Sequence, residues 1–133
     1  MEHPYKENTM SERFELVKSY LMDMELPIIS EDPAEELVVV QDEERGVHHL
    51  VVDCEDDILI LEQVIMPAPA EDAAIYKRLL QMNRDLVHGA FVLDDEAKFL
   101  LFRDTLQLAN LDRNELEGSV QALSLALAEY GAE

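Results

Sequence analysis

The residues best suited to catalysis or metal binding in this sequence lie close together, on the apolar segment 47–54. His48 and His49 are near its start, and Cys54, the single cysteine of the chain, is its last residue. A cysteine nucleophile needs a histidine base within hydrogen-bonding distance, but residues six apart on one strand are separated by roughly 20 Å. Adjacent strand residues point to opposite faces, so we do not expect His48 and His49 to bind one metal ion together. We therefore expect a buried, structural Cys54 and neither a metal nor another cofactor.

Other motifs of catalysis or ligand binding are missing from the sequence. The glycines stand apart at positions 46, 89, 118 and 131, so there is no glycine-rich phosphate loop. No serine lies in a Gly-x-Ser-x-Gly nucleophile motif. Acidic triplets at 42–44, 55–57 and 94–96 separate apolar runs and lack the residue order of a calcium loop. We expect these triplets to be solvated turns and the protein not to be an enzyme; an unfamiliar carboxylate site is the remaining enzymatic alternative.

Three further residues could contact a ligand, but each also has a structural interpretation. Gly89 follows a helical pattern and opens a strand, which favours a helix C-cap or a close backbone approach. Asn83 lies on an apolar stripe of that helix, where a buried carboxamide can hydrogen-bond a neighbouring strand; contact with a ligand is the alternative. Arg103 stands next to Asp104, and in a chain of net charge −20 an ion pair is favoured over an anion site.

The elements that must position these residues follow the order α-β-β-β-α-β-β-α, which predicts an α+β protein. A capping box formed by Thr9 and Glu12 predicts the start of the first helix, with residues 1–8 frayed. Pro27 ends this helix, because proline cannot continue it. We expect the acidic stretch 28–36 to be a connection without regular structure.

Three apolar runs joined by short turns predict an antiparallel meander, with strands at 37–40, 47–54 and 58–66. The second half of the chain predicts a helix over 75–86, two strands near 90–93 and 99–102, and a final helix. Asp112 and Glu115 form an acidic variant of the capping box at the start of that last helix.

Much of the predicted sheet is apolar on both faces. Because strand side chains alternate, consecutive apolar residues such as those at 58–61 must point to opposite sides. Three helices rarely cover both faces of a five-stranded sheet, so we expect the second face to contact another chain; cover on both faces is the alternative. The helix over 75–86 also carries a second apolar stripe, which indicates burial on two sides.

Composition limits the partners that this protein can bind. Thirty acidic residues against ten basic ones argue against nucleic acid and anionic membranes, both of which need a basic face. The region 30–57 holds eleven acids and one base, which indicates either solubility or attraction of a basic or partly unfolded partner. The length of 133 residues predicts one domain over 1–133. Without a signal peptide or a membrane-length apolar run, and with one cysteine, we expect a cytoplasmic protein.

The block LLQMNRDLVHGAFVLDDEAKFLLFRDTL, together with the order of elements, resembles the class I type III secretion chaperone-like fold, which includes the YbjN-type domains. The resemblance extends over about residues 10–130. It implies an antiparallel five-stranded sheet with helices packed against it. It also implies a non-enzymatic homodimer that binds an extended segment of a client protein along apolar patches and strand edges.

The same resemblance implies that the middle helix and the adjoining strand form the dimer interface. The residues at these positions are Tyr76, Leu80, Asn83, Val87, Phe91, Val92 and Leu93. We assign client binding to apolar residues of the strand meander, namely Val38, Val40, Val51, Leu59 and Leu61. A regulatory adaptor, or a small-molecule sensor with a pocket near Asn83, is the alternative function.

Overall fold

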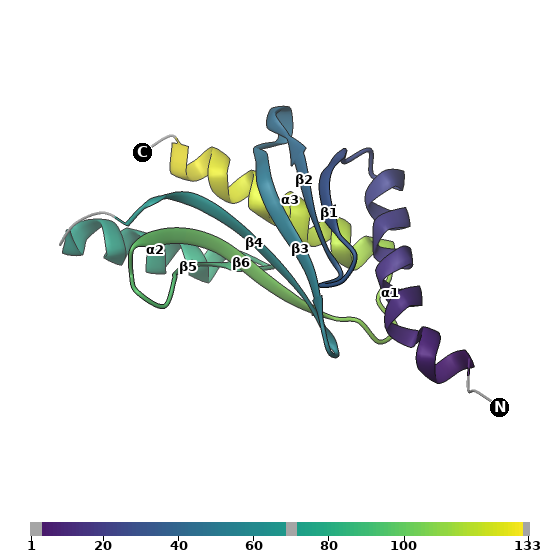
Figure 1. Ribbon diagram of the computed structural model, residues 1–133. Helices are drawn as coiled ribbons and strands as arrows, with labels where there is room; N and C mark the ends of the chain where they lie inside the picture. Colours follow the sequence, from purple (N-terminus) through teal and green to yellow (C-terminus); the bar gives the residue numbers. More distant parts are fainter. Residues whose placement is uncertain (1–3, 69–71, 132–133) are drawn as a thin grey trace.

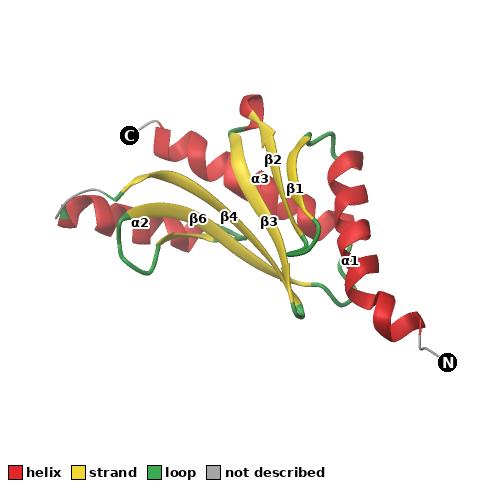
Figure 2. Ribbon diagram, viewed as in Figure 1, coloured by secondary structure: helices red, strands yellow, loops and turns green. Residues whose placement is uncertain are grey.

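The computed structural model describes residues 4–68 and 72–131. Its elements, in chain order, are α1 (Pro4–Asp23), β1 (Ile28–Asp32), β2 (Leu37–Asp42), the 3₁₀ turn η1 (Glu43–Arg45), β3 (Val47–Glu55), β4 (Ile58–Pro67), α2 (Ala73–Asp85), β5 (Ala90–Leu93), β6 (Phe99–Gln107) and α3 (Arg113–Gly131). The fold is α+β, with three helices and an antiparallel sheet (Figures 1 and 2). None of the described helices is both long and apolar enough to cross a membrane.

The sheet has six strands in the order β1-β2-β3-β4-β6-β5, and every neighbouring pair is antiparallel. The predicted meander is present as β2, β3 and β4, but the prediction of five strands is wrong. The extra strand is β1, which lies within the stretch 28–36 that we expected to be irregular. Four of the five residues of β1 are exposed, so this edge strand carries no alternation of apolar and polar residues that would reveal it.

The first helix starts earlier than the sequence predicts. It begins at Pro4, and Thr9 lies inside it rather than at its N-cap. Proline suits the first helical position, because its fixed φ is already helical and its missing N–H would have no partner there. Residues 4–8 are therefore helical and not frayed, while residues 1–3 lie outside the described part of the chain.

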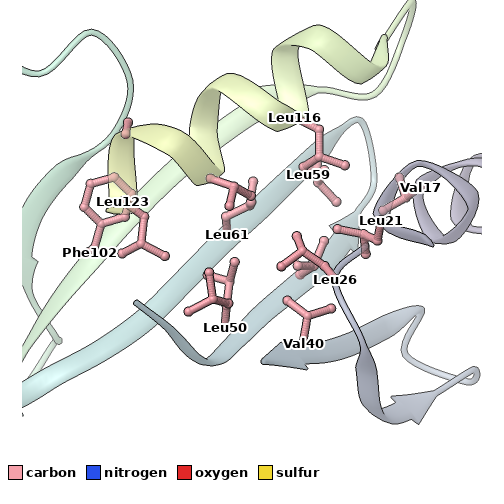
Figure 3. Packing of buried hydrophobic residues seen from close by; sticks show 14 of the residues in the cluster. Val17, Leu21, Leu26, Val40, Leu50, Leu59, Leu61, Phe102, Leu116 and Leu123 are labelled. Carbon is pink, nitrogen blue, oxygen red and sulfur yellow. The ribbon is translucent and has the colours of Figure 1, made fainter. Parts of the chain in front are cut away.

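All three helices contribute to one apolar core on one face of the sheet. Figure 1 shows α3 crossing behind β2 and β3, with α1 near the β1 end of the sheet and α2 near the β5 end. Figure 3 shows Leu50 and Leu61 of the sheet on the side where α1 and α3 lie, and both belong to the same core as Leu123 of α3. Burying each such leucine contributes about 1.5–3 kcal/mol to stability, so these side chains stabilise the packing of the helices on this face of the sheet.

A capping box determines where α3 begins, and a glycine in close contact with β6 follows the end of α2. Asp112 and Glu115 accept hydrogen bonds from each other's backbone N–H, at 2.9 and 3.2 Å, which confirms the predicted capping box of α3. Gly89 has a φ of 77°, and a Cβ at this position would lie 2.3 Å from the ring of Phe102. The predicted backbone role of Gly89 is confirmed, since only glycine allows β5 to follow α2 so closely.

Candidate functional site

The face of the sheet opposite the helices is only partly covered. We call it the outer face and define it by the apolar residues Val39, Val51, Ile60, Val64, Val92 and Leu101. Inward residues such as Val40, Leu50 and Leu61 are 0 or 1% exposed, whereas Val64 is 53% exposed. Leu101 is buried but does not belong to the core, because it pairs with Val64 across the strands and shares its outward direction. No helix of the described residues packs its core side chains on this face, so the alternative of cover on both faces is not seen, while contact with another chain stays a prediction.

A hollow of about 340 Å³ lies on this face, where β3 and β4 separate. Regular pairing of the two strands ends at Val51 and Glu62. Beyond this point the buried Gln63 side chain joins them, donating to the Gly46 carbonyl oxygen at 3.0 Å and accepting from the His48 N–H at 2.9 Å. The hollow is lined by His48, His49, Val51, Glu62, Val64 and Leu101. A side-chain amide thus replaces part of the backbone ladder between β3 and β4.

His48 and His49 do not point to opposite faces as predicted. Their rings are stacked, with centroids 4.4 Å apart. His49 has a φ of 51°, which breaks the alternation that a regular strand would impose. Among residues 4–68 and 72–131, no three histidine, cysteine or acidic side chains are grouped closely enough to hold a metal ion.

Cys54 is buried at the other end of β3, as predicted. Burial raises the pKa of its thiol to about 12, and the nearby carboxylate of Glu36 acts in the same direction. The thiol therefore remains protonated at neutral pH, and a protonated thiol is a poor nucleophile. This geometry agrees with a structural cysteine.

Charged side chains cross the outer face beside the apolar residues. Arg103 on β6 and Glu62 on β4 form an ion pair of 3.1 Å, so the predicted ion pair of Arg103 is present with Glu62 as its partner. Burial and, second to it, the neighbouring Glu55 together raise the pKa of Asp53 on β3 to about 6. The outer face therefore combines an apolar centre with an excess of acid.

The residues assigned to the dimer interface gather at the α2–β5 end of the sheet, but not all of them reach the surface. Leu80, Val87 and Leu93 are 70, 88 and 41% exposed. Tyr76 and Asn83 on α2 and Val92 on the outer face are half-buried. Phe91 belongs to the core and packs against Phe102, edge to face at 6.3 Å. Its side chain is therefore not at the surface of this chain, and its assignment to the dimer interface stays a prediction.

Asn83 closes the edge of the sheet at β5. Its Oδ1 accepts a hydrogen bond from the Phe91 N–H at 2.8 Å, and its Nδ2 donates to the Phe91 carbonyl oxygen at 3.2 Å. The interpretation that this carboxamide hydrogen-bonds a neighbouring strand is confirmed. Because β5 is an end strand, these bonds occupy the backbone groups that an added strand would need at Phe91.

Four of the five residues assigned to client binding are in the core. Val38, Val40, Leu59 and Leu61 are 0 or 1% exposed beneath the helices. Their side chains are therefore not at the surface of this chain, and their assignment to client binding stays a prediction. Val51 alone points outward, into the hollow. The sequence shows two apolar sets on each strand but does not reveal which set the helices cover.

Sequence reasoning did not assign the outward residues Ile60, Val64 and Leu101 to a binding surface. Ile60 alternates with two leucines of β4 that are in the core, and this alternation is the signal that marks it as outward. Val64 lies before a register shift in β4, where alternation is no longer regular. Only the pairing of Val64 with Leu101 places both on the outer face.

Several solved structures share this fold. YbjN from E. coli matches with a TM-score of 0.69 at 15% identity, covering 90% of this chain and 91% of its own. A chain of the HopA1–SchA chaperone–effector complex matches with a TM-score of 0.67 at 12% identity, covering 93% of this chain and 98% of its own. A chain of the ExsC–ExsE complex matches with a TM-score of 0.63 at 19% identity, covering 91% of each chain.

Identities this low establish a shared fold and nothing finer. No curated protein matches the chain significantly. The CesT_Tir_1 family model, however, matches residues 10–133, which is nearly the whole sequence. The resemblance identified from the order of elements and the 79–106 block is confirmed, and the chain belongs to the CesT_Tir_1 family.

Proposed function

We propose that this protein is a non-enzymatic, chaperone-like binding domain, formed by residues 1–133, that holds a segment of a client protein. The observation that carries the proposal is the outer face, where apolar side chains stay partly exposed around a hollow of about 340 Å³. Exposed apolar surface that is grouped and rimmed by polar residues is typical of a protein-interaction site. We expect the client to place apolar side chains in this hollow, beside Val51 and Val64.

The structural relatives support a protein-binding function. The HopA1–SchA complex is a chaperone–effector complex, and ExsC was solved in complex with ExsE. Because relatives with this fold form complexes with other proteins, the fold supports protein binding by this chain as well. The client differs from relative to relative, so its chemistry has to be inferred from this chain.

We infer a homodimer formed through the α2–β5 end. Leu80, Val87 and Leu93 expose apolar surface there, and an isologous dimer would bury the same patch on both copies. Asn83 blocks strand pairing at Phe91, so we expect the two copies to meet through side chains and not through a continuous sheet.

Small-molecule sensing is the second candidate, with a ligand near Asn83. Both ends of the Asn83 carboxamide are already engaged with the backbone of Phe91. A side chain held by two such bonds serves the protein's own structure, which favours protein binding over ligand sensing at this position. A regulatory adaptor would use the same protein-binding surface.

The test of the proposal is affinity capture with a Val64→Lys variant, followed by mass spectrometry. A lysine at this position places a charge in the apolar hollow, so client proteins retained by the wild type should be lost. Asn114→Lys is the matched control, because it adds the same charge at an exposed position of α3. Equal capture by the wild type and Val64→Lys would remove the outer face as a client site.

A further inference from the structure

Two stacked imidazole rings form one wall of the outer-face hollow. His48 and His49 both line it, and their ring centroids lie 4.4 Å apart, with the ring planes 25° from parallel. Both side chains are exposed, so protons from the solvent reach them. Imidazole is the side chain that gains a proton between about pH 8 and about pH 5. The wall of the hollow can therefore gain charge within this range.

The backbone holds the two rings together against the ordinary alternation of a strand. His49 has a φ of 51°, a region that residues other than glycine rarely occupy. The buried Gln63 side chain fixes the backbone just before it, by accepting from the His48 N–H at 2.9 Å and donating to the Gly46 carbonyl oxygen at 3.0 Å. Strained residues of this kind persist where the surrounding structure holds them, and they cluster at binding and switch sites.

Charged groups of three neighbouring elements face the rings. Glu43 of η1 lies 3.5 Å from Nδ1 of His48, so a first proton on His48 would form an ion pair with it. Glu62 of β4 lines the same hollow, and its carboxylate is 3.1 Å from Arg103 of β6. One proton on the pair therefore meets carboxylates that can balance its charge.

A second proton has no such balance. It would put two like charges 4.4 Å apart, well within the Debye length of about 8 Å at physiological ionic strength, so salt would not screen their repulsion. Charged rings also disfavour an apolar occupant beside Val51, Val64 and Leu101, because the charge would lose water without gaining a polar partner. Both effects act against apolar side chains in the hollow.

A carboxyl group further along β3 changes the charge of the outer face in the same direction. Asp53 shares the outward direction of Val51, two residues before it. Burial and, second to it, Glu55 raise the pKa of Asp53 to about 6, and the charges of Glu35 and Glu62 act in the same direction. Protonation of Asp53 removes a negative charge, so the outer face becomes less acidic as the pH falls.

We propose that the His48–His49 pair makes the outer-face hollow a pH-sensitive binding site, which holds apolar side chains of a partner while both rings are neutral and releases them when both are protonated. The inference rests on the proposed protein-binding function and adds the regulation of that site. The proton is the effector, because it binds the rings that form the wall of the hollow. Mild acid should thus release the partner while the domain stays folded.

The experiment uses Nile red, a neutral apolar dye, in place of the apolar side chains of a client. Its binding to the full chain is titrated by fluorescence at about pH 7.5 and about pH 5.5, within the range in which imidazole gains its proton. The Kd should rise at least about fivefold at the lower pH, a change that titration resolves readily. In the wild type, ¹³C NMR of the histidine rings should show the coupled pair taking up its protons in two steps.

Four variants assign the effect to its groups. His48→Gln with His49→Asn removes both titrating rings, and asparagine tolerates the positive φ; this variant should bind the dye equally at both pH values. His88→Gln is the matched control, because it removes a half-buried histidine at the β5 end of the sheet, and it should keep the fivefold change. Asp53→Asn should keep most of it. Val64→Lys should bind the dye weakly at both pH values, which places the dye in the hollow.

Several outcomes would overturn the inference. These are an equal Kd of the wild type at the two pH values, independent titration of the two rings, and dye binding that Val64→Lys leaves intact. A pH dependence that persists in the double histidine variant would also overturn it, with melting curves at both pH values to verify folding. The wild-type measurements need no variant, so they decide even if the double variant does not fold.

Failure of the proposed function has a different signature. Clients would then be captured equally by the wild type and Val64→Lys, while dye binding would still weaken in acid. A client lost in Val64→Lys together with a Kd for the dye that does not depend on pH would leave the proposed function in place and overturn only the inference.

Discussion

The two edge strands of the sheet, β5 and β1, differ in how their outward backbone N–H and C=O groups are treated. At β5, the Asn83 carboxamide occupies the backbone groups of Phe91, and the nearby surface is apolar, with Leu80 and Val87 exposed. At β1, the backbone is open, and the surrounding residues are acidic. The Asn83 side-chain amide blocks the addition of any further strand at Phe91, whereas negative charge disfavours only acidic partners. The two ends therefore differ in whether their backbone groups are already bonded or open to a further strand.

The largest expected effect is on the closed end, in Gly89→Ala. A Cβ would lie 2.3 Å from the Phe102 ring, at a residue whose φ is 77°. Overpacking and the positive φ together should lower the free energy of unfolding by about 3 kcal/mol. Chemical denaturation measures this change.

Gly46→Ala is its control, since φ is 78° there but the nearest atom is a flexible Leu127 methyl at 3.3 Å. It should cost about 1 kcal/mol. Equal losses in the two variants would mean that contact with Phe102 does not hold β5 in place.

Asn83→Leu should open the β5 edge. It removes two hydrogen bonds and leaves the Phe91 N–H and C=O without their partners, which should lower the free energy of unfolding by about 2 kcal/mol. Hydrogen exchange should also show faster exchange of the Phe91 amide. Exchange at Phe91 as slow as in the wild type would show that Asn83 does not protect this edge.

Val87→Lys tests whether the closed end joins two copies. If the proposed dimer is correct, a charge in its apolar centre should cost about 2 kcal/mol of binding, about 30-fold in Kd. Sedimentation velocity over a concentration series measures the change. Leu125→Lys is the control, because Leu125 is also exposed, at 68%, but lies on α3. Dissociation by Leu125→Lys instead would move the interface to α3.

The smallest expected effect concerns the acidic side of the sheet, at Asp53. Its pKa is raised from 3.8 to about 6 by burial and by Glu55, so the folded state binds a proton more tightly than the unfolded state does. Stability should therefore rise as pH falls from 7 toward 4, and it should decrease as pH rises through 6.

Asp53→Asn should remove this dependence and raise the melting temperature at pH 7 by about 4 °C, as expected for about 1 kcal/mol in a chain of this size. Asp95→Asn, in the exposed β5–β6 turn, serves as the control. A melting temperature that rises equally in both variants would point to net charge and not to Asp53 itself.

Local patterns predicted most of the elements correctly. The capping box of Asp112 and Glu115, the turn at the acidic triplet 42–44 and the strand meander depend on residues close in sequence, so the sequence reveals them directly. The start of α1 was misplaced because a capping box also occurs by chance inside a helix. The strand β1 was missed because its pairing with β2 is tertiary and leaves four of its five residues exposed.

The candidate site was less predictable from the sequence. His48 and His49 share one side only because His49 adopts a positive φ, which no neighbouring residue type demands. The client-binding assignment fell on the covered set of residues, since Val38 and Val51 belong to equally apolar runs. The alternation of side chains separates the two faces of a strand, but it does not indicate which face packs against the helices.

The sequence by itself determined the class of fold, the order of most elements, the strong acidity and the lack of a catalytic motif. These properties follow from composition and from interactions between residues a few positions apart. Only the tertiary structure decided which sheet face lies under the helices, that a sixth strand forms, and that Asn83 closes one edge while the other stays open. Those outcomes depend on contacts between segments distant in sequence, and such contacts stabilise the protein only after folding has brought the segments together.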